Sequence, residues 1–285
     1  MTSIFGNQLK TFVLLALLTS LLLWIGNYFG GYIGLVFAIV FVMIMNFSMF
    51  FFSDKIVLSM YKAKEAGKNS EIHHLVSEVA RTFKLPMPKV YIIPSKNPNA
   101  FATGRSPKHS SVAFTNGILD LLKKHELKGV IAHELSHIKN RDTLVTTVAA
   151  TIAGIISYVA SMARWAAIFG GFGGRDRGNS NIFELLALAI LTPLIATILQ
   201  LAISRSREFM ADELAAKKTK DPYSLADALK KISENGKMHP MGLGSKTTSA
   251  LFINNPFKGN GLLNLFSTHP PVDERIKRLK SMRIR

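Results

Sequence analysis

The chain has 285 residues, of which 48% are hydrophobic and 19% are charged, a balance typical of a membrane protein with one modest soluble domain. It contains no cysteine, which excludes disulfides and thiolate metal sites and leaves histidine and carboxylate side chains as metal ligands. The formal net charge of +17, beside long apolar segments, indicates cytoplasmic loops and attraction to anionic lipid, so we expect no nucleic acid partner.

Two apolar runs, residues 11–29 and 32–52, lie near the start of the chain and are separated by Gly30 and Gly31. Each is long enough to cross a hydrocarbon core of ~30 Å as a helix. A cleaved signal peptide is the alternative for the first run, but no small-residue cleavage site follows it. Lysines flank the pair on both sides: Lys10 before it, and Lys55, Lys62, Lys64 and Lys68 after it. The positive-inside rule therefore predicts a transmembrane hairpin with both flanks in the cytoplasm.

The segment after the hairpin has the pattern of a small α+β domain. Apolar residues at helical spacing predict a helix over residues 71–83, which Leu85-Pro-Met-Pro ends. Short β-rich pieces then predict a small sheet, with strands at 89–93, 100–103 and 111–114. A further helix, residues 116–124, leads into the stretch that carries the chemistry.

That stretch is residues 126–142, ELKGVIAHELSHIKNRD. Its periodicity is helical, so His133 and His137, four residues apart, share one face and can together hold one zinc ion. Glu134 is adjacent and can act as the general base toward a water molecule at that ion. The alternative is an ordinary amphipathic helix with two surface histidines.

Two weaker apolar runs, residues 143–163 and 182–203, are joined by the linker GGFGGRDRGNSN. Both have nearly the length of a membrane span, although Glu184 and Pro193 interrupt the second. We expect a second transmembrane hairpin, and a buried helical hairpin within the soluble domain is the alternative.

The last part of the chain is polar. We expect helices over 204–218 and 223–234, and a basic helix from Pro270-Pro271 to Arg285, after a loop rich in Gly, Asn and Ser over 235–267. The expected domains are a transmembrane hairpin (1–54), a first catalytic part (55–142), the second apolar hairpin (143–203) and a second catalytic part (204–285).

A catalytic zinc ion normally has three protein ligands, so a third must come from elsewhere. Glu208 is the best candidate, because a chain that leaves the His133 helix and crosses the membrane twice returns to the same face just before it. Asp212 lies one turn beyond Glu208 and can accept the second N–H of a ligand histidine. The alternative for both carboxylates is the solvated face of a surface helix.

Four motifs together resemble one family: HELSH at 133–137, SRSREFMAD at 204–212, NAFATG at 99–104, and THPP at 268–271 followed by Glu274-Arg275-Ile276. They are similar to the HtpX group of membrane-bound zinc metalloproteases, relatives of the Ste24 and Oma1 peptidases. The resemblance implies a mostly α membrane protein with a gluzincin-type α+β domain. It also implies one zinc ion per chain, held by His133, His137 and Glu208, with Glu134 as catalytic base.

The resemblance further implies a multi-pass protein of the bacterial inner membrane that degrades damaged membrane proteins at the cytoplasmic face, in quality control and the stress response. Ala100–Thr103 corresponds to an edge strand to which an extended substrate adds. Asn99 and His269 correspond to positions near the reacting carbonyl, and a turn-forming asparagine and a loop-stabilising histidine are the alternatives. Homo-oligomerisation is left open.

Two other classes of function compete with a protease. A non-proteolytic scaffold with structural zinc would not need Glu134, and a structural site normally has four protein ligands. A transporter is suggested only by the four apolar runs, in which Glu184 is the single acidic residue. We therefore expect a zinc metalloendopeptidase whose substrates are unfolded membrane-protein segments.

Overall fold

The computed structural model describes residues 4–142, 145, 149, 152–153, 156, 160–161, 180–236, 238–239, 252–253 and 270–283. The chain forms two compact units, and both are discontinuous in sequence. The first comprises Met1–Phe47 and Thr146–Ile203, and the second comprises Ser48–Val145 and Ser204–Arg285.

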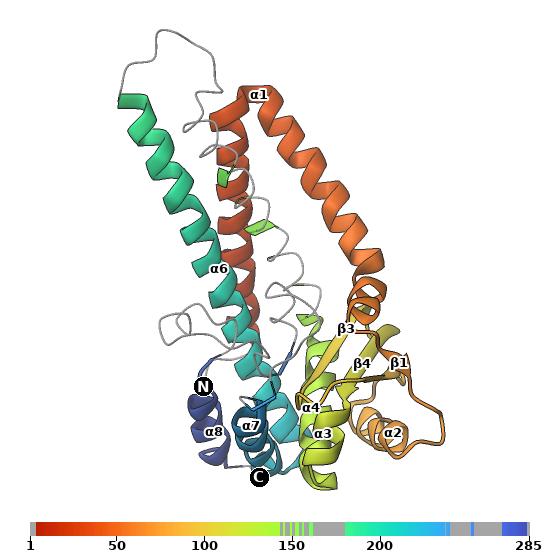
Figure 1. The fold of residues 1–285 in the computed structure, drawn as a ribbon. Helices are drawn as coiled ribbons and strands as arrows, with labels where there is room; N and C mark the ends of the chain where they lie inside the picture. The colour runs from red at the N-terminus through yellow and green to blue at the C-terminus, as the bar shows by residue number, and fades with distance from the viewer. Residues whose placement is uncertain are drawn as a thin grey trace. The chain divides into compact units, whose positions relative to one another are not determined.

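The first unit contains two long helices in its described part. Helix α1 (Ile4–Met60) doubles back at Gly31, whose positive φ of 56° is readily adopted by glycine (Figure 1). Helix α6 (Ser180–Thr219) begins in this unit and continues into the second. It runs through Pro193 without ending there, and the hydroxyl of Thr197 donates to the Pro193 carbonyl at 2.7 Å.

Within the described ranges, no helix combines the length and the apolar character that a bilayer crossing requires. The two transmembrane hairpins stay predictions. Most of the apolar run 143–163 and of the loop 235–267 lies outside the described residues.

The second unit contains the small sheet predicted from the sequence. Its strand order is β1 (Lys64–Glu65), β2 (Lys89–Ile93), β4 (His109–Thr115) and β3 (Ala100–Ser106). Strands β2 and β4 are parallel, and the other two pairs are antiparallel. Because β3 has only β4 as a neighbour in this sheet, it is an edge strand.

The described helices of the second unit, besides the ends of α1 and α6, are α2 (Glu71–Phe83), α3 (Asn116–Leu121), α4 (Lys124–Asn140), α7 (Pro222–Gly236) and α8 (Val272–Lys280). The boundaries predicted for α2 are confirmed. The helix expected over 116–124 is shorter and ends at Leu121, because Leu122 is extended, with φ −95° and ψ 140°. The last helix was expected to reach Arg285 but ends at Lys280, where Ser281 caps it through bonds to the preceding carbonyls.

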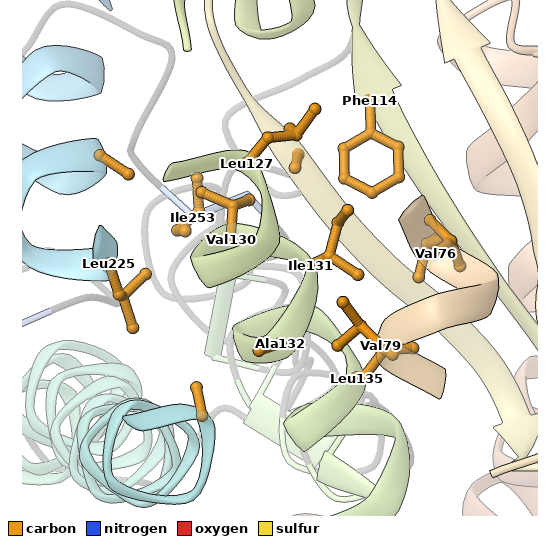
Figure 2. Close-up of a cluster of buried hydrophobic side chains, with 14 of the residues drawn as sticks. Val76, Val79, Phe114, Leu127, Val130, Ile131, Ala132, Leu135, Leu225 and Ile253 are labelled. Atoms are coloured by element: carbon orange, nitrogen blue, oxygen red, sulfur yellow. The ribbon is translucent and has the colours of Figure 1, made fainter. Parts of the chain in front are cut away.

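Helix α4 lies at the centre of the second unit. Figure 2 shows its apolar residues in contact with side chains from three directions: Val76 and Val79 of α2, Phe114 of β4, and Leu225 of α7. Burying each large apolar side chain contributes about 1.5–3 kcal/mol, so this packing holds α4 firmly between sheet and helices. An ordinary surface helix is thereby excluded.

Polar contacts hold both ends of α4. At its start, the Glu126 carboxylate accepts the Lys123 backbone N–H at 2.8 Å and the Lys231 ammonium of α7 at 2.7 Å. Near its end, the Lys139 ammonium donates to the Phe83 carbonyl at 2.9 Å, where the C-terminus of α2 carries partial negative charge. These contacts fix the position of α4, and with it the position of any side chain on its remaining face.

Helices α4 and α7 approach closely at Gly129. A Cβ atom there would lie 2.8 Å from the Leu225 backbone nitrogen, which cannot move without moving α7. Although alanine favours helices over glycine, we expect Gly129→Ala to destabilise the protein by about 1–3 kcal/mol. Thermal unfolding of purified protein measures this. The control is Gly67→Ala, because a Cβ at Gly67 has no neighbour within 4 Å; equal melting temperatures for the two variants would contradict the prediction.

Candidate metal centre

Helix α4 places the two histidines of the HELSH motif side by side. The Nε2 atoms of His133 and His137 lie 3.1 Å apart. The His133 side chain is 1% exposed and that of His137 is 13% exposed. Neither is therefore a solvated surface histidine, which the alternative interpretation of this helix required.

Helix α6 brings Glu208 to the same place. Its Oε2 atom lies 3.5 Å from His133 Nε2, and its Oε1 atom lies 3.4 Å from His137 Nε2. Among the described residues, these three form the one group of histidine, cysteine and acidic side chains that could hold a metal ion.

The spacing of the three side chains fits a zinc ion. Zinc binds histidine nitrogen and carboxylate oxygen at about 2.0–2.2 Å in tetrahedral geometry, which separates ligand atoms by roughly 3.3–3.5 Å. The two Nε2 atoms, 3.1 Å apart, are slightly closer than this value, and each lies within it from a different Glu208 oxygen: His133 at 3.5 Å from Oε2 and His137 at 3.4 Å from Oε1. One ligand atom of each residue lies within 4.8 Å of the other two. Two histidines and one glutamate also match a common donor set of catalytic zinc, which leaves one position open to a small molecule.

Each histidine has a second carboxylate behind it. His133 Nδ1 lies 3.0 Å from Asp212 Oδ1, and His137 Nδ1 lies 2.9 Å from Asp142 Oδ2. A carboxylate in this position accepts the Nδ1–H, so the ring presents its unprotonated Nε2 to a metal and becomes more basic. Both rings are thus held in the tautomer and orientation that metal binding needs.

Asp142 reaches His137 because α4 ends abruptly. Arg141 adopts the left-handed conformation, with φ 57°, and its backbone N–H bonds to the His137 and Ile138 carbonyls. This turn ends the helix and brings the Asp142 carboxylate beside the His137 ring. Arg207, the neighbour of Glu208 on α6, pairs with Asp142 through its Nε at 2.8 Å. The end of α4 is therefore bound to the segment that supplies Glu208.

Arg275 of α8 is fully buried behind the group. Its Nε and Nη2 atoms donate to the two carboxylate oxygens of Asp212 at 2.8 and 2.7 Å. Its Nη1 lies 3.1 Å from Glu208 Oε2. Burial raises the pKa of Asp212, but the charge and hydrogen bonds of Arg275 outweigh it and hold that pKa at about 2. Asp212 therefore stays ionised and able to orient His133.

The buried carboxylates also raise the pKa values of the two histidines. Burial lowers the pKa of His133, but its bonds to Asp212 and Glu208 raise it more. Burial lowers the pKa of His137 as well, and Asp142 and Glu208 raise it well above its usual value. Protons therefore compete with a metal for this group, and metal binding releases them.

Glu134 follows His133 on α4 and is 2% exposed. Burial raises its pKa, and the negative charge of Glu208 adds to this, while His133, His137 and Arg275 partly oppose it. A carboxylate with a raised pKa is a stronger base and holds a proton more readily near neutral pH, as proton transfer requires.

The remaining candidates from the sequence are Asn99 and His269. Asn99 is fully buried at the start of β3, where its amide group donates to Asn97 Oδ1 and its side-chain oxygen accepts the Ala100 N–H. Its backbone also bonds to Thr115. These contacts shape the turn into β3, as the turn-forming alternative requires. His269 lies outside the described residues.

Sequence reasoning missed Asp142, Arg207 and Arg275. Asp142 ends the stretch that contains His133, five residues after His137, but its role depends on the left-handed Arg141. Arg207 and Arg275 were present in the motifs, each beside a glutamate. Nothing in the local pattern shows that these two arginines are buried and paired with carboxylates.

Comparisons with known proteins agree with this arrangement. The chain matches Peptidase family M48 over residues 66–283. It is 50% identical over 278 residues to the "Protease HtpX homolog" of Syntrophotalea carbinolica, covering 98% of this chain and 99% of that protein. A protein of the same description from Thermococcus kodakarensis is 50% identical over 277 residues, 96% of this chain and 95% of the other.

The fold also resembles a solved structure. The crystal structure of S. mikatae Ste24p superimposes with a TM-score of 0.57 at 19% sequence identity, covering 96% of this chain and 66% of the other. At this identity, the similarity concerns the fold alone.

Replacing Asp142 and Asp212 by asparagine tests whether these carboxylates support metal binding. We expect Asp142→Asn and Asp212→Asn each to weaken zinc binding by about 10- to 100-fold, because an amide no longer orients and polarises the ring as a carboxylate does. Zinc affinity is measured by competition with a coloured chelator. The exposed Asp227→Asn on α7 is the matched control. Affinities equal to that of the control would mean that the two buried carboxylates serve the fold alone.

Proposed function

Because the chain belongs to peptidase family M48, we propose that this metalloprotease is a membrane-embedded zinc endopeptidase that degrades misfolded or damaged membrane proteins at the cytoplasmic face. The observation that carries the zinc assignment is the group of His133, His137 and Glu208, whose ligand atoms all lie within 4.8 Å of one another. Its two histidines are each backed by a buried carboxylate.

The chain's own residues supply the proton transfers of peptide hydrolysis. Zinc held by His133, His137 and Glu208 would polarise the peptide carbonyl and make water more acidic. Glu134 accepts the proton of the attacking water and then delivers it to the nitrogen of the leaving amine. Burial suits Glu134 to both steps, because the raised pKa of its carboxyl group allows it to hold the proton between them.

Strand β3 supports the proposal that the substrate is an unfolded segment. An extended peptide can add to a sheet edge through backbone hydrogen bonds, which read conformation more than side-chain identity. A folded protein offers no free strand, whereas a damaged one does. This selectivity suits quality control and the response to stress, and it requires no defined cleavage sequence.

The membrane part of the proposal is supported by the sequence. Runs 11–29, 32–52, 143–163 and 182–203 are apolar, and the flanking segments 55–142 and 204–285 carry most of the basic residues. We propose that both flanking segments lie in the cytoplasm, with the linker around Arg175 and Arg177 on the opposite side. Nothing in the site requires a homo-oligomer.

The principal alternative is a scaffold that binds structural zinc. In the described part of the chain, the candidate group has three protein ligands, where a structural site would normally have four. A buried Glu134 with a raised pKa has no evident purpose in a scaffold. Both observations favour hydrolysis.

Replacing the proposed base tests the chemistry directly. We expect Glu134→Gln to lower cleavage of casein by detergent-purified protein at least about 100-fold while zinc content stays near that of the parent, because general bases contribute about 10²- to 10⁴-fold. Glu208→Gln should lower zinc affinity and activity together. The exposed Glu78→Gln is the matched control. Loss of zinc from the Glu134 variant would instead make that residue a ligand.

The topology is tested with cysteines in this cysteine-free chain. In intact cells, a membrane-impermeant thiol reagent should label Ser180→Cys, which lies at the start of α6 and at the end of the linker sequence, and should not label Asn69→Cys until the cells are lysed. Labelling of neither before lysis would place the second hairpin on the cytoplasmic side.

A further inference from the structure

The outer edge of strand β3 is occupied by another part of the chain. The Ile253 backbone N–H donates to the Ala100 carbonyl at 3.1 Å. That carbonyl points away from β4, because the carbonyl of the preceding residue, Asn99, accepts from Thr115 at the end of β4 and successive residues of a strand alternate. The bond to Ile253 is therefore made on the side of β3 that faces no strand of the sheet.

Phe252 and Ile253 also place their side chains as a strand would. Phe252 packs on one face of the sheet, with its ring 5.1 Å from that of Phe101 and 4.9 Å from that of Tyr61. Ile253 belongs to the core on the opposite face, beside Val130 of α4 in Figure 2. The two side chains lie on opposite faces of the sheet, as successive residues of a strand do, although their backbone is bent and is joined to β3 by the bond from Ile253 to Ala100. Both side chains are buried, at 0% and 2% exposed.

Ile253 is connected to the candidate metal centre through Arg275. The Ile253 carbonyl accepts from Arg275 Nη1 at 3.2 Å. That nitrogen also lies 3.1 Å from Glu208, and the rest of the guanidinium binds Asp212. The backbone of Ile253 thus joins the edge of β3 on one side to the residues that surround the candidate ligands on the other.

We infer that Phe252–Ile253 occupies the position of a substrate strand and must leave before a peptide can add to β3. The inference rests on the proposed proteolytic function and concerns its regulation. A peptide that pairs with β3 requires the outward groups of Ala100, and the Ala100 carbonyl already has Ile253 as its partner. An extended peptide that pairs with the outward groups of Ala100 and of further residues of β3 gains hydrogen bonds beyond the one made by Ile253, and can displace it.

The apparent affinity for substrate should therefore be reduced by the fraction of molecules in which the edge is free. We expect Phe252→Ala, which removes the aromatic anchor, to lower the KM for casein at least about threefold with kcat unchanged. Val57→Ala is the control, because Val57 of α1 belongs to the same buried cluster but lies outside the segment. A Phe252→Ala KM equal to or above that of the control would overturn the inference, because a merely structural contact would leave KM unchanged or raise it.

A reversible cross-link tests the effect of holding the segment in place on β3. Phe101 and Phe252 face each other, so cysteines at both positions can join the segment to β3. We expect the oxidised Phe101→Cys/Phe252→Cys protein to show kcat/KM at least about tenfold below that of the same protein after reduction, with equal zinc content. Equal kcat/KM before and after reduction, with the disulfide verified by mass, would overturn the inference. Cleavage by the parent protein reports separately on the proposed function.

Discussion

The ion pair between Arg275 and Asp212 lies at the centre of the contacts that surround the candidate metal ligands. A buried charge is destabilising unless it is paired and fully hydrogen-bonded. Here the buried guanidinium of Arg275 donates to both carboxylate oxygens of the buried Asp212. Asp212 in turn orients His133, while Arg275 also reaches Glu208 and the Ile253 carbonyl. One arginine therefore connects α8, α6, α4 and the segment at the edge of β3, although these lie far apart in sequence.

Both members of this pair are buried, so removing either one would destabilise the fold around the site. Breaking a buried ion pair by removing one partner typically destabilises a protein by about 3–5 kcal/mol, because the other charge is left uncompensated. The network at His137 has the same construction, with Asp142 between the histidine and Arg207. Each histidine thus contacts a carboxylate, and each of these carboxylates in turn pairs with an arginine. The negative charge of each carboxylate, which raises the basicity of the histidine ring, is balanced by the positive charge of its arginine.

The parts of this arrangement that sequence predicts are those governed by local periodicity. His133 and His137 share a face because they are four residues apart, and α2 begins and ends where its apolar pattern and the following Leu85-Pro-Met-Pro indicate. Glu208 was identified by an argument about chain topology, and the structure brings it beside both histidines. Asp142 could not be assigned in this way, because its position depends on one left-handed residue, Arg141.

Contacts between residues far apart in the sequence were harder to predict than Asp142. Nothing in the local pattern around Arg275 indicates that its side chain lies between Asp212 and Glu208, and the short final helix was expected to continue to Arg285. Likewise, the resemblance to the HtpX group implies an edge strand at 100–103 but not its neighbour Ile253, which pairs there with Ala100 from outside the sheet. Such pairings are decided by the packing of the whole unit.

Helix α6 has a further consequence for how this chain can change. Glu208 lies on a helix that runs without interruption from Ser180 to Thr219, so no loop separates the ligand from the apolar segment before it. Each residue added to or removed from an α-helix turns the remainder of that helix by about 100° and shifts it by about 1.5 Å. An insertion between Ile203 and Glu208 would therefore turn the apolar part of α6 relative to the Glu208 carboxylate, even if every side chain were kept. A substitution in this part of α6 leaves the helical phase unchanged, whereas a change in its length does not.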